Sequence, residues 1–403
     1  MSTPWKTDQW FTSPLNFADE VRKDLNFPEK IQIHDVSLRD GEQQCGLVYT
    51  RDDKVRIAEK LAEVGIHRIE AGMPVVSKQD EQAIRDIVKL KLPCEIFAFS
   101  RCMVDDVKRA ADCGVQGVVV EIPSSEHIIR HAYQWPVEKA IDLSITATLA
   151  AKEEGLYTVW FPIDATRADL NWLLDMVERV ATEGHMDALA VVDTFGGTHP
   201  HAIPYLVRKI RERVDKPLET HFHDDFGCGV ANTLMGLAAG CTVAHTTVTG
   251  IGERAGNASY EDMVLALRCM YDVDIGIKTR KMVELSNLVR EVSDLKIPTN
   301  RPIVGDLLYQ IESGIIASWY KNCGKENELE LCPFSAAMVG QEEPDVVIGK
   351  GSGIDSVGIW LERLGIQASE EERMALLMDI KEKSMDLHRL LTVEEFKALA
   401  GKG

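Results

Sequence analysis

The spacing of apolar residues changes regularly between residues 31 and 272. Short runs in which apolar residues are continuous or alternate with polar ones predict β-strands. The stretches between them repeat apolar residues every three or four positions, which is typical of helices. The predicted strands span residues 31–35, 68–71, 95–100, 117–122, 157–162, 188–193, 218–223 and 243–248. The pattern therefore predicts eight consecutive strand–helix units.

Eight such units in about 240 residues are typical of an α/β fold, the (β/α)8 TIM barrel. The stretch 51–64 illustrates its helices, because Ile57, Ala58 and Leu61 share one face and Gly65 follows as a C-terminal cap. An open, doubly wound sheet is the alternative. That fold often carries a G-x-G-x-x-G turn after its first strand, and none follows any predicted strand here. The barrel is therefore favoured.

The sequence outside this rhythm predicts two further parts. Residues 1–29 hold Trp5, Trp10, Phe11 and Phe17 before any barrel strand, and we expect an N-terminal arm that packs on the barrel or on a partner subunit. Residues 30–275 form the predicted catalytic barrel. Residues 276–403 lose the strand–helix rhythm and predict a mainly helical C-terminal lid and dimerisation region.

Composition limits the possible partners and compartments. The formal net charge of −19 argues against nucleic acid or an anionic membrane as a partner. The chain has no apolar run of about 18 residues that would span a membrane, and its first residues do not resemble a signal peptide. Nine cysteines without a Cys-x-x-Cys pair favour a reduced, cytoplasmic protein.

Two polar runs follow predicted strands and carry the candidate chemistry. His221 and His223 lie two positions apart near the end of the seventh strand, so their imidazoles point to the same face. Asp40 follows the first strand, which in a closed barrel lies near the seventh, and Asn257 follows the eighth. A lone His-x-His pair is more often structural or superficial. Together, these four side chains predict a site for a divalent metal, Zn²⁺, Mn²⁺ or Mg²⁺, acting as a Lewis acid.

Further residues at the strand ends suggest the substrate. A 2-oxo acid can chelate such a metal, and Arg39 would then stabilise the negative charge that develops on its carbonyl oxygen. Glu70 and Asp193, which end the second and sixth strands, are candidates for orienting the metal ligands; the alternative is an ion pair at the barrel top. Thr194 is a candidate donor to the substrate carboxylate.

These residues resemble the DRE-TIM metallolyase family, which includes 2-isopropylmalate, homocitrate and citramalate synthases and, more distantly, HMG-CoA lyases. The resemblance rests on Asp-Val-Ser-Leu-Arg-Asp-Gly-Glu-Gln at 35–43, His-Phe-His-Asp-Asp-Phe-Gly at 221–227 and Thr-Gly-Ile-Gly-Glu-Arg-Ala-Gly-Asn at 249–257. It covers roughly residues 30–360. It implies metal ligation by Asp40, His221, His223 and Asn257, and a 2-oxo acid surrounded by Arg39, Gln43, Glu70 and Thr194. It also implies a homodimer in which the region after the barrel covers the partner's active site.

The chain departs from the family at groups that handle protons. Ile311 stands where the synthases usually carry a histidine before Glu-Ser-Gly-Ile, and Ile163 stands where they carry a glutamate after the fifth strand. Phe161 replaces a serine, and Gly351 replaces a histidine. An aliphatic side chain cannot transfer a proton. Either Tyr309, Tyr320, His127 or Asp164 supplies the base, or the reaction has changed.

Three functions remain open from the sequence. The first is a metal-dependent acyltransferase that condenses acetyl-CoA or another acyl-CoA with a 2-oxo acid. The second is a metal-dependent lyase or aldolase that cleaves a 2-hydroxy acid without CoA, which would explain the missing methyl-activating groups. The third is a non-catalytic relative that binds a metabolite, against which the intact set of Arg39, Asp40, His221 and His223 speaks.

Overall fold

The computed structural model describes residues 3–401, and its contacts divide the chain into two compact units. The larger unit comprises Phe17–Ile297, and the smaller combines Met1–Asn16 with Pro298–Gly403. These boundaries differ from those expected at residues 29 and 275. The later boundary moves because helix α11, Met282–Ser293, packs on helix α2, Arg51–Val64. Lys60 of α2 also pairs with Glu284 of α11.

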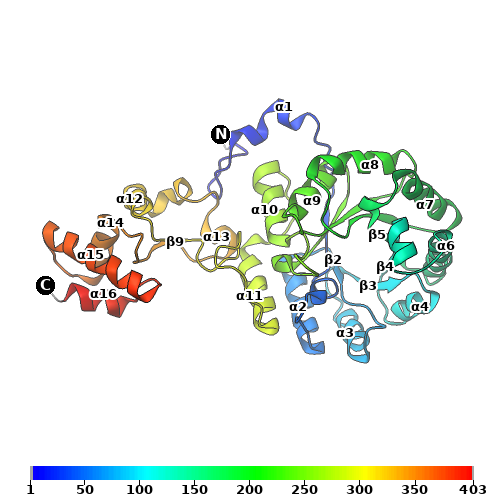
Figure 1. Ribbon diagram of the computed structural model, residues 1–403, viewed down its shortest axis with the longest axis horizontal. Coiled ribbons are helices and arrows are strands. Elements are labelled where there is room, and N and C mark those ends of the chain that lie inside the picture. Colours follow the sequence, from blue (N-terminus) through cyan, green and yellow to red (C-terminus); the bar gives the residue numbers. More distant parts are fainter. Residues whose placement is uncertain (1–2, 402–403) are drawn as a thin grey trace. The chain divides into compact units, whose positions relative to one another are not determined.

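The larger unit is a closed parallel barrel in the order β1-β2-β3-β4-β5-β6-β7-β8, which confirms the predicted fold class (Figure 1). Its strands are β1 Gln32–Asp35, β2 Arg68–Glu70, β3 Glu95–Arg101, β4 Gly117–Pro123, β5 Tyr157–Ile163, β6 Ala188–Asp193, β7 Leu218–Phe222 and β8 Val243–Thr246. Each lies where the sequence pattern placed a strand. Closure pairs β1 with β8, with His34 opposite His245.

Helices surround the barrel (Figure 1). After α2 they are α3 Lys78–Lys89, α4 Val104–Asp112, α5 Glu126–His131, α6 Glu138–Glu153, α7 Leu170–Glu183, α8 Ile203–Arg211, α9 Gly229–Ala238, α10 Tyr260–Tyr271 and α11. The loops add 3-10 turns η2 Gly41–Gln43, η3 Ala165–Arg167, η4 Pro200–Ala202, η5 Val248–Gly250 and η6 Thr279–Lys281. Helix α2 begins with a capping box from Thr50 and Asp53, and Gly65 ends it in the left-handed conformation with φ 97°.

The barrel interior has an apolar half and a polar half. Strands β3 to β6 contribute an apolar cluster of Phe97, Phe99, Val119, Val159, Phe161, Ala188, Ala190 and Val192. Strands β1, β2, β7 and β8 contribute the buried side chains of His34, Arg68, Glu70, Glu219, His221 and His245. The ring of Phe161 contacts that of His221, with centroids 4.8 Å apart, so the two halves meet at a candidate metal ligand.

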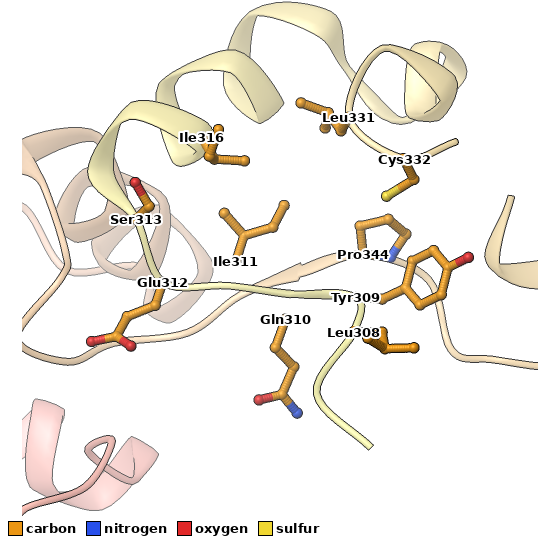
Figure 2. Close-up of a pocket in the computed structure, with 10 residues that line it drawn as sticks. All are labelled: Leu308, Tyr309, Gln310, Ile311, Glu312, Ser313, Ile316, Leu331, Cys332 and Pro344. Atoms are coloured by element: carbon orange, nitrogen blue, oxygen red, sulfur yellow. The ribbon is translucent and has the colours of Figure 1, made fainter. Parts of the chain in front are cut away.

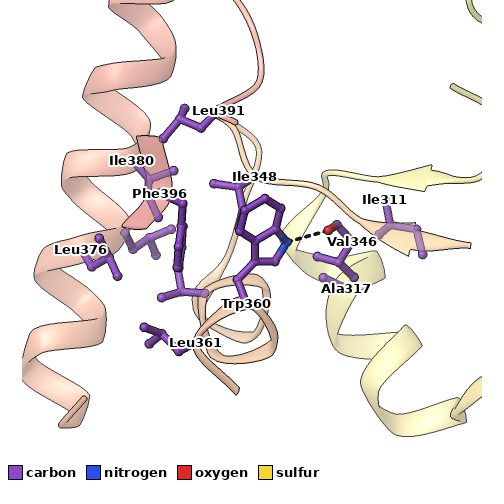
Figure 3. Close-up of a cluster of buried hydrophobic side chains, with 12 residues drawn as sticks. Ile311, Ala317, Val346, Ile348, Trp360, Leu361, Leu376, Ile380, Leu391 and Phe396 are labelled. Atoms are coloured by element: carbon purple, nitrogen blue, oxygen red, sulfur yellow. Dashed lines mark hydrogen bonds between the residues drawn. The ribbon is translucent and has the colours of Figure 1, made fainter. Parts of the chain in front are cut away.

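The smaller unit is mainly helical. Its elements are η1 Pro14–Phe17 in part, β9 Gln310–Ile311, α12 Gly314–Cys323, η7 Lys325–Glu330, α13 Ala336–Val339, β10 Asp345–Val346, α14 Ile354–Leu364, α15 Glu370–Leu387 and α16 Val393–Ala400. Strands β9 and β10 pair in parallel. Trp360 of α14 belongs to the core, contacts the tilted ring of Phe396 and donates a 2.7 Å hydrogen bond from Nε1 to the carbonyl of Val346 (Figure 3).

The expected N-terminal arm divides between the two units. Phe11 N–H donates to the carbonyl of Pro333 at 2.8 Å, and Ser335 N–H donates to the carbonyl of Gln9 at 2.8 Å, so the first segment joins the C-terminal unit. The second segment lies on the barrel, where Asn26 N–H donates to the carbonyl of Ala238. Within this chain, the segment before residue 17 therefore joins the C-terminal unit and not the barrel unit, and packing on a partner subunit stays a prediction. Backbone pairing with 333–335, which no side-chain pattern indicates, decides its position. Within residues 3–401, we find no helix with the length and apolarity to cross a bilayer.

Candidate metal centre and active site

Three predicted ligands converge at the carboxyl ends of the barrel strands. Asp40 follows β1, His221 belongs to β7 and His223 comes directly after it. One nitrogen or oxygen atom from each lies within 4.8 Å of the others, and all three side chains are buried. His221 Nε2 is 3.5 Å from Asp40 Oδ2. The spacing is that of side chains able to share one cation.

A glycine-rich loop brings Asn257 to the same place. Its backbone conformation requires glycine at Gly256, because a Cβ there would lie 1.9 Å from the carbonyl oxygen of Gly250. Thr249 adopts the left-handed conformation with φ 58°, and its N–H is held by both carboxylate oxygens of Glu261 at 3.0 Å. This loop brings the amide nitrogen of Asn257 to 2.7 Å from Asp40 Oδ1.

Unpartnered atoms at the centre fit a bound cation. Asn257 Nδ2 donates to Asp40 and to the carbonyl of Ile251, which leaves Asn257 Oδ1 without a partner within residues 3–401. His221 Nδ1 is also buried without a partner. His223 Nδ1 lies 3.1 Å from the carbonyl of Gly256, an arrangement that holds the ring and leaves Nε2 as the ligand atom. Buried polar atoms are rarely left unpaired, and a divalent cation satisfies those that are acceptors.

The charges are arranged for the deprotonated ligands that a metal requires. Burial alone would raise the pKa of Asp40, but the Arg39 guanidinium and the contact with His221 hold that pKa well below its usual range. Burial lowers the pKa of His221 to about 3, so its imidazole is neutral at pH 7. A carboxylate and neutral imidazoles are the forms that bind metals.

Arg39 lies beside this centre and is held from several sides. Its guanidinium pairs with Glu70, donates to Asp40 Oδ2 at 2.9 Å and to Gln43 Oε1 at 3.3 Å, and lies 3.8 Å above the Phe99 ring. Its second terminal nitrogen, Nη2, has no hydrogen-bond partner among the residues that the structure describes. A fixed guanidinium with a free donor is suited to an oxyanion. The sequence indicated Glu70 and Gln43 but gave no signal for Phe99, which reaches Arg39 only through the barrel register.

The other two predicted residues lie around the sixth strand. Thr194 Oγ1 accepts from the N–H of Asp164 at 2.8 Å, so its own hydroxyl proton remains to be donated. Asp193 is buried and accepts from Thr166 Oγ1 and from the N–H groups of Gly197 and Thr198. Among the described hydrogen bonds of Asp193, none reaches Asp40, His221 or His223. Asp193 therefore holds the backbone of the loop after β6 in place.

A second cluster lies inside the barrel, where His34, Glu219 and His245 bring potential ligand atoms within 4.8 Å. It is poorly suited to a cation. Arg68 already donates to Glu219 at 2.7 Å, and a second cation would be repelled by it. The rings of His34 and His245 stack 4.4 Å apart at an angle of 28°, and His245 Nε2 is already 2.8 Å from Glu219 Oε2. These groups balance charge within the polar half of the barrel.

The positions where the family carries acid–base groups hold residues that cannot transfer a proton. Ile311 belongs to the buried core of the C-terminal unit and lines a pocket of about 250 Å³ there (Figure 2). The N–H of Gly351 donates to Glu312 at 2.8 Å, and a Cβ on Gly351 would lie 3.2 Å from the same carboxylate oxygen. Tyr309 donates its hydroxyl to the carbonyl of Phe334 at 3.0 Å, and burial raises its pKa.

Two other candidate bases meet in the barrel unit. His127 Nε2 is 3.4 Å from Asp164 Oδ2. The Asp164 carboxylate is fully buried and also accepts hydrogen bonds from Ser125 and Arg167. These bonds join the loops after β4 and β5. Because its oxygens are already engaged, Asp164 is suited to hold this loop rather than to accept a proton.

A closed (β/α)8 barrel with one carboxylate and two histidines at its carboxyl end defines a class of barrel enzymes whose site is suited to a metal ion. The chain belongs to the HMGL-like family, whose profile matches residues 30–289. It is 38% identical to the homocitrate synthase AksA of Methanothermobacter thermautotrophicus over 93% of each chain. It is 35% identical to 2-isopropylmalate synthase 2 of Caldanaerobacter subterraneus subsp. tengcongensis, over 92% of this chain and 94% of that protein. The chain thus lies among the synthases, which are condensing enzymes.

Solved structures share the barrel. HMG-CoA lyase of Bacillus subtilis matches with a TM-score of 0.60 at 22% sequence identity, over 68% of this chain and 98% of that one. Hydroxymethylglutaryl-CoA lyase of Pseudomonas aeruginosa matches with a TM-score of 0.59 at 21% identity, over 68% and 96% of the two chains. At these identities the likeness shows the fold alone.

Proposed function

We propose that this protein is a metal-dependent acyltransferase that condenses an acyl-CoA with a 2-oxo acid. The single observation that carries the proposal is the convergence of Asp40, His221 and His223 beside the fixed guanidinium of Arg39. The synthase names of relatives that match nearly the whole chain support the condensing direction.

Asp40, His221 and His223, with Asn257 Oδ1 as a fourth donor, would hold the divalent cation. The mixed nitrogen and oxygen set suits Zn²⁺, Mn²⁺ or Mg²⁺. Bound there, the ion supplies Lewis acidity toward the oxygens of a chelating 2-oxo acid.

The protein's own side chains then account for orientation and charge. Nη2 of Arg39, which has no partner among the described residues, donates to the carbonyl oxygen as negative charge develops on it. Glu70 and Phe99 fix the guanidinium, so little reorganisation is needed at that moment. Gln43 steadies Arg39 from the solvent side, and the hydroxyl proton of Thr194 is donated to the substrate carboxylate. Asp193 positions the loop that carries Thr194.

The apolar side chains of β5, here called the β5 wall, determine which 2-oxo acids can be acceptors. Val159 and Phe161 are buried in the apolar cluster, and Ile163 packs against it. A buried carboxylate at this wall would lose its hydration without gaining a partner, which is costly. We therefore expect an acceptor whose distal portion is apolar rather than acidic.

A lyase acting on a 2-hydroxy acid without CoA is the second candidate. Ile163 and Ile311 favour it, because both stand where the synthases carry groups for proton transfer at the acyl methyl. The same oxygen-stabilising residues would serve the reverse cleavage. The two candidates differ in whether thiol is released.

We also propose a homodimer. Helix α15 buries Leu376, Leu377 and Ile380 on one side, yet Met374, Met378 and Met385 are about half exposed at helical spacing on another. An exposed methionine row of this kind suits contact with a second copy. Light scattering coupled to size exclusion measures the mass; a monomer at all concentrations would contradict the proposal.

The deciding experiment is an assay of thiol release. Metal-loaded protein is incubated with acetyl-CoA and each of a panel of 2-oxo acids, and free thiol and product mass are measured. We expect release that depends on both metal and acceptor, highest for acceptors with apolar side chains. No release with any acceptor, together with 2-oxo acid formation from a hydroxy acid, would favour the lyase instead.

A further inference from the structure

Glu121 places a carboxyl group beside the apolar cluster of β3 to β6, at the carboxyl end of the barrel. It lies on β4, two positions beyond Val119, whose side chain belongs to the interior cluster. Because strand side chains alternate, Glu121 faces the same interior, one step closer to the carboxyl end. Its neighbours in register are Arg101 on β3 and Phe161 on β5.

This position brings Glu121 close to the candidate metal centre. The adjacent Phe161 ring contacts His221, with 4.8 Å between centroids. Phe161 also contacts Phe99, the ring that carries the Arg39 guanidinium. Glu121 and Arg39 are near enough to interact through their charges. The carboxyl group thus lies within electrostatic range of the guanidinium that would hold the carbonyl oxygen.

The groups around Glu121 orient its carboxylate and change its pKa. The hydroxyl of Tyr133, in the turn after α5, donates to its carboxylate, and Arg101 faces it from β3. Burial raises the pKa of Glu121 although Arg39, Tyr133 and Arg101 each oppose that change. The side chain remains partly exposed at the barrel mouth, so a substrate can reach it. A carboxylate with a pKa moved toward neutrality is suited to accept a proton.

We propose that Glu121, on β4, is the general base that takes the proton from the acyl-CoA carbon. It would replace the glutamate that the family carries on β5, where this chain has Ile163. This rests on the proposed condensing function. The C–H electron pair forms the new C–C bond to the carbonyl carbon of the 2-oxo acid, and the carbonyl oxygen becomes an alkoxide. The alkoxide takes back the proton held by Glu121. Water then attacks the thioester, the C–S bond breaks, and the thiol leaves with a proton from that water.

The competing base is His127, a partly exposed side chain whose Nε2 lies 3.4 Å from the buried carboxylate of Asp164. Its described contacts join the loops after β4 and β5. By contrast, Glu121 lies in register with Phe161, whose ring contacts those of His221 and Phe99. Geometry therefore favours Glu121, and the two assignments give opposite results in the same assay.

The test compares Glu121→Gln, Glu121→Asp, Tyr133→Phe and His127→Gln with wild type, and Glu154→Gln serves as an exposed control. In Glu121→Gln we expect kcat for thiol release to fall about 10²- to 10⁴-fold, with KM for the oxo acid changed less than about threefold. The acid limb of its kcat–pH profile disappears. Glu121→Asp should recover part of the rate. Tyr133→Phe should move the acid limb to higher pH, because the carboxylate loses a donor that favours its charged form.

A second readout separates this inference from the proposed function. Wild type in D₂O with metal and a 2-oxo acid should exchange the acetyl-CoA methyl protons, and Glu121→Gln should not. Thiol release by wild type and Glu121→Gln at equal rates would overturn the role of Glu121 alone, as would loss of activity in His127→Gln only. Absence of both thiol release and exchange in wild type would overturn the condensing function and this inference with it. Metal content and circular dichroism check that each variant is folded and loaded.

Discussion

The side-chain amide of Asn257 donates a 2.7 Å hydrogen bond to the carboxylate of Asp40, across 217 positions of sequence. The bond fixes the orientation of both groups: the amide nitrogen faces Asp40, and Oδ1 is left as an acceptor without a partner. The carboxylate in turn keeps the Arg39 guanidinium on its other oxygen. One contact therefore links the loop after β8 to the run after β1 at the place where the histidines of β7 arrive.

Replacing Asn257 should weaken metal binding without unfolding the barrel. In Asn257→Ala, Asp40 loses a donor that orients it and the site loses an oxygen ligand. We expect about a 10- to 100-fold loss of metal affinity, the usual effect of removing a group that supports metal ligands. Competition against a chromophoric chelator measures the affinity, and Asn171→Ala, at an exposed position of α7, is the control. Unchanged affinity for Mn²⁺ and Zn²⁺ would contradict Asn257 as a member of the site.

Arg39 should matter for rate more than for metal binding. Arg39→Lys keeps a positive charge but cannot contact Glu70, Asp40 and an oxyanion at once. We expect kcat to fall about 10²- to 10³-fold, comparable to removing one donor from an oxyanion site. Metal content, measured by mass spectrometry, should stay within twofold of wild type. If the variant loses metal but keeps the wild-type rate per bound ion, then Arg39 acts only by positioning the metal ligands.

The sequence predicted most of what the barrel contributes. Its strands follow from short apolar runs, and Asp40, His221 and His223 follow from alternation and strand order alone. A closed barrel brings the ends of all strands to one face, so three positions far apart in sequence had to meet. Arg39 and Glu70 belong to the same logic, and their ion pair is present.

The sequence could not predict contacts that depend on register or on loop conformation. Phe99 supports Arg39 because the registers of β1 with β2 and of β2 with β3 bring the two side chains together, and composition does not specify those registers. The segment before residue 17 joins the C-terminal unit through backbone hydrogen bonds, which leave no side-chain pattern. Glu121 could have been found, because β4 alternates and its inward positions can be counted from Val119.

Glu261 should make the protein less stable as the pH rises toward neutrality. Burial raises its pKa to about 7 in the folded state, while an unfolded glutamate titrates near its usual value. A raised pKa means that the fold favours the protonated form. Stability is therefore complete below about pH 4.5 and declines as the pH rises through 7, by about 3 kcal/mol for a shift of this size.

The variant that tests this is Glu261→Gln, which keeps an acceptor for the N–H of Thr249 and can donate to Ser259. Urea unfolding at pH 5 and pH 8 measures the free energy of unfolding. We expect the variant to gain stability relative to wild type at pH 8 and to gain little at pH 5. A larger gain at pH 5 would reverse the sign and show that the carboxylate is ionised in the fold.

Removing the first sixteen residues should loosen the C-terminal unit and leave the barrel unchanged. The deletion leaves the Pro333 carbonyl and the Ser335 N–H without their backbone partners, and it removes the side chains of Trp10 and Phe11 from that unit. We expect faster hydrogen–deuterium exchange in residues 333–346, with unchanged exchange in β1 to β8. Lys6→Ala is the matched control, because its ion pair with Glu330 is half exposed on both sides and such pairs contribute little. Faster exchange in the barrel strands, with none in residues 333–346, would show that the segment belongs to the barrel, as the aromatic residues alone had suggested.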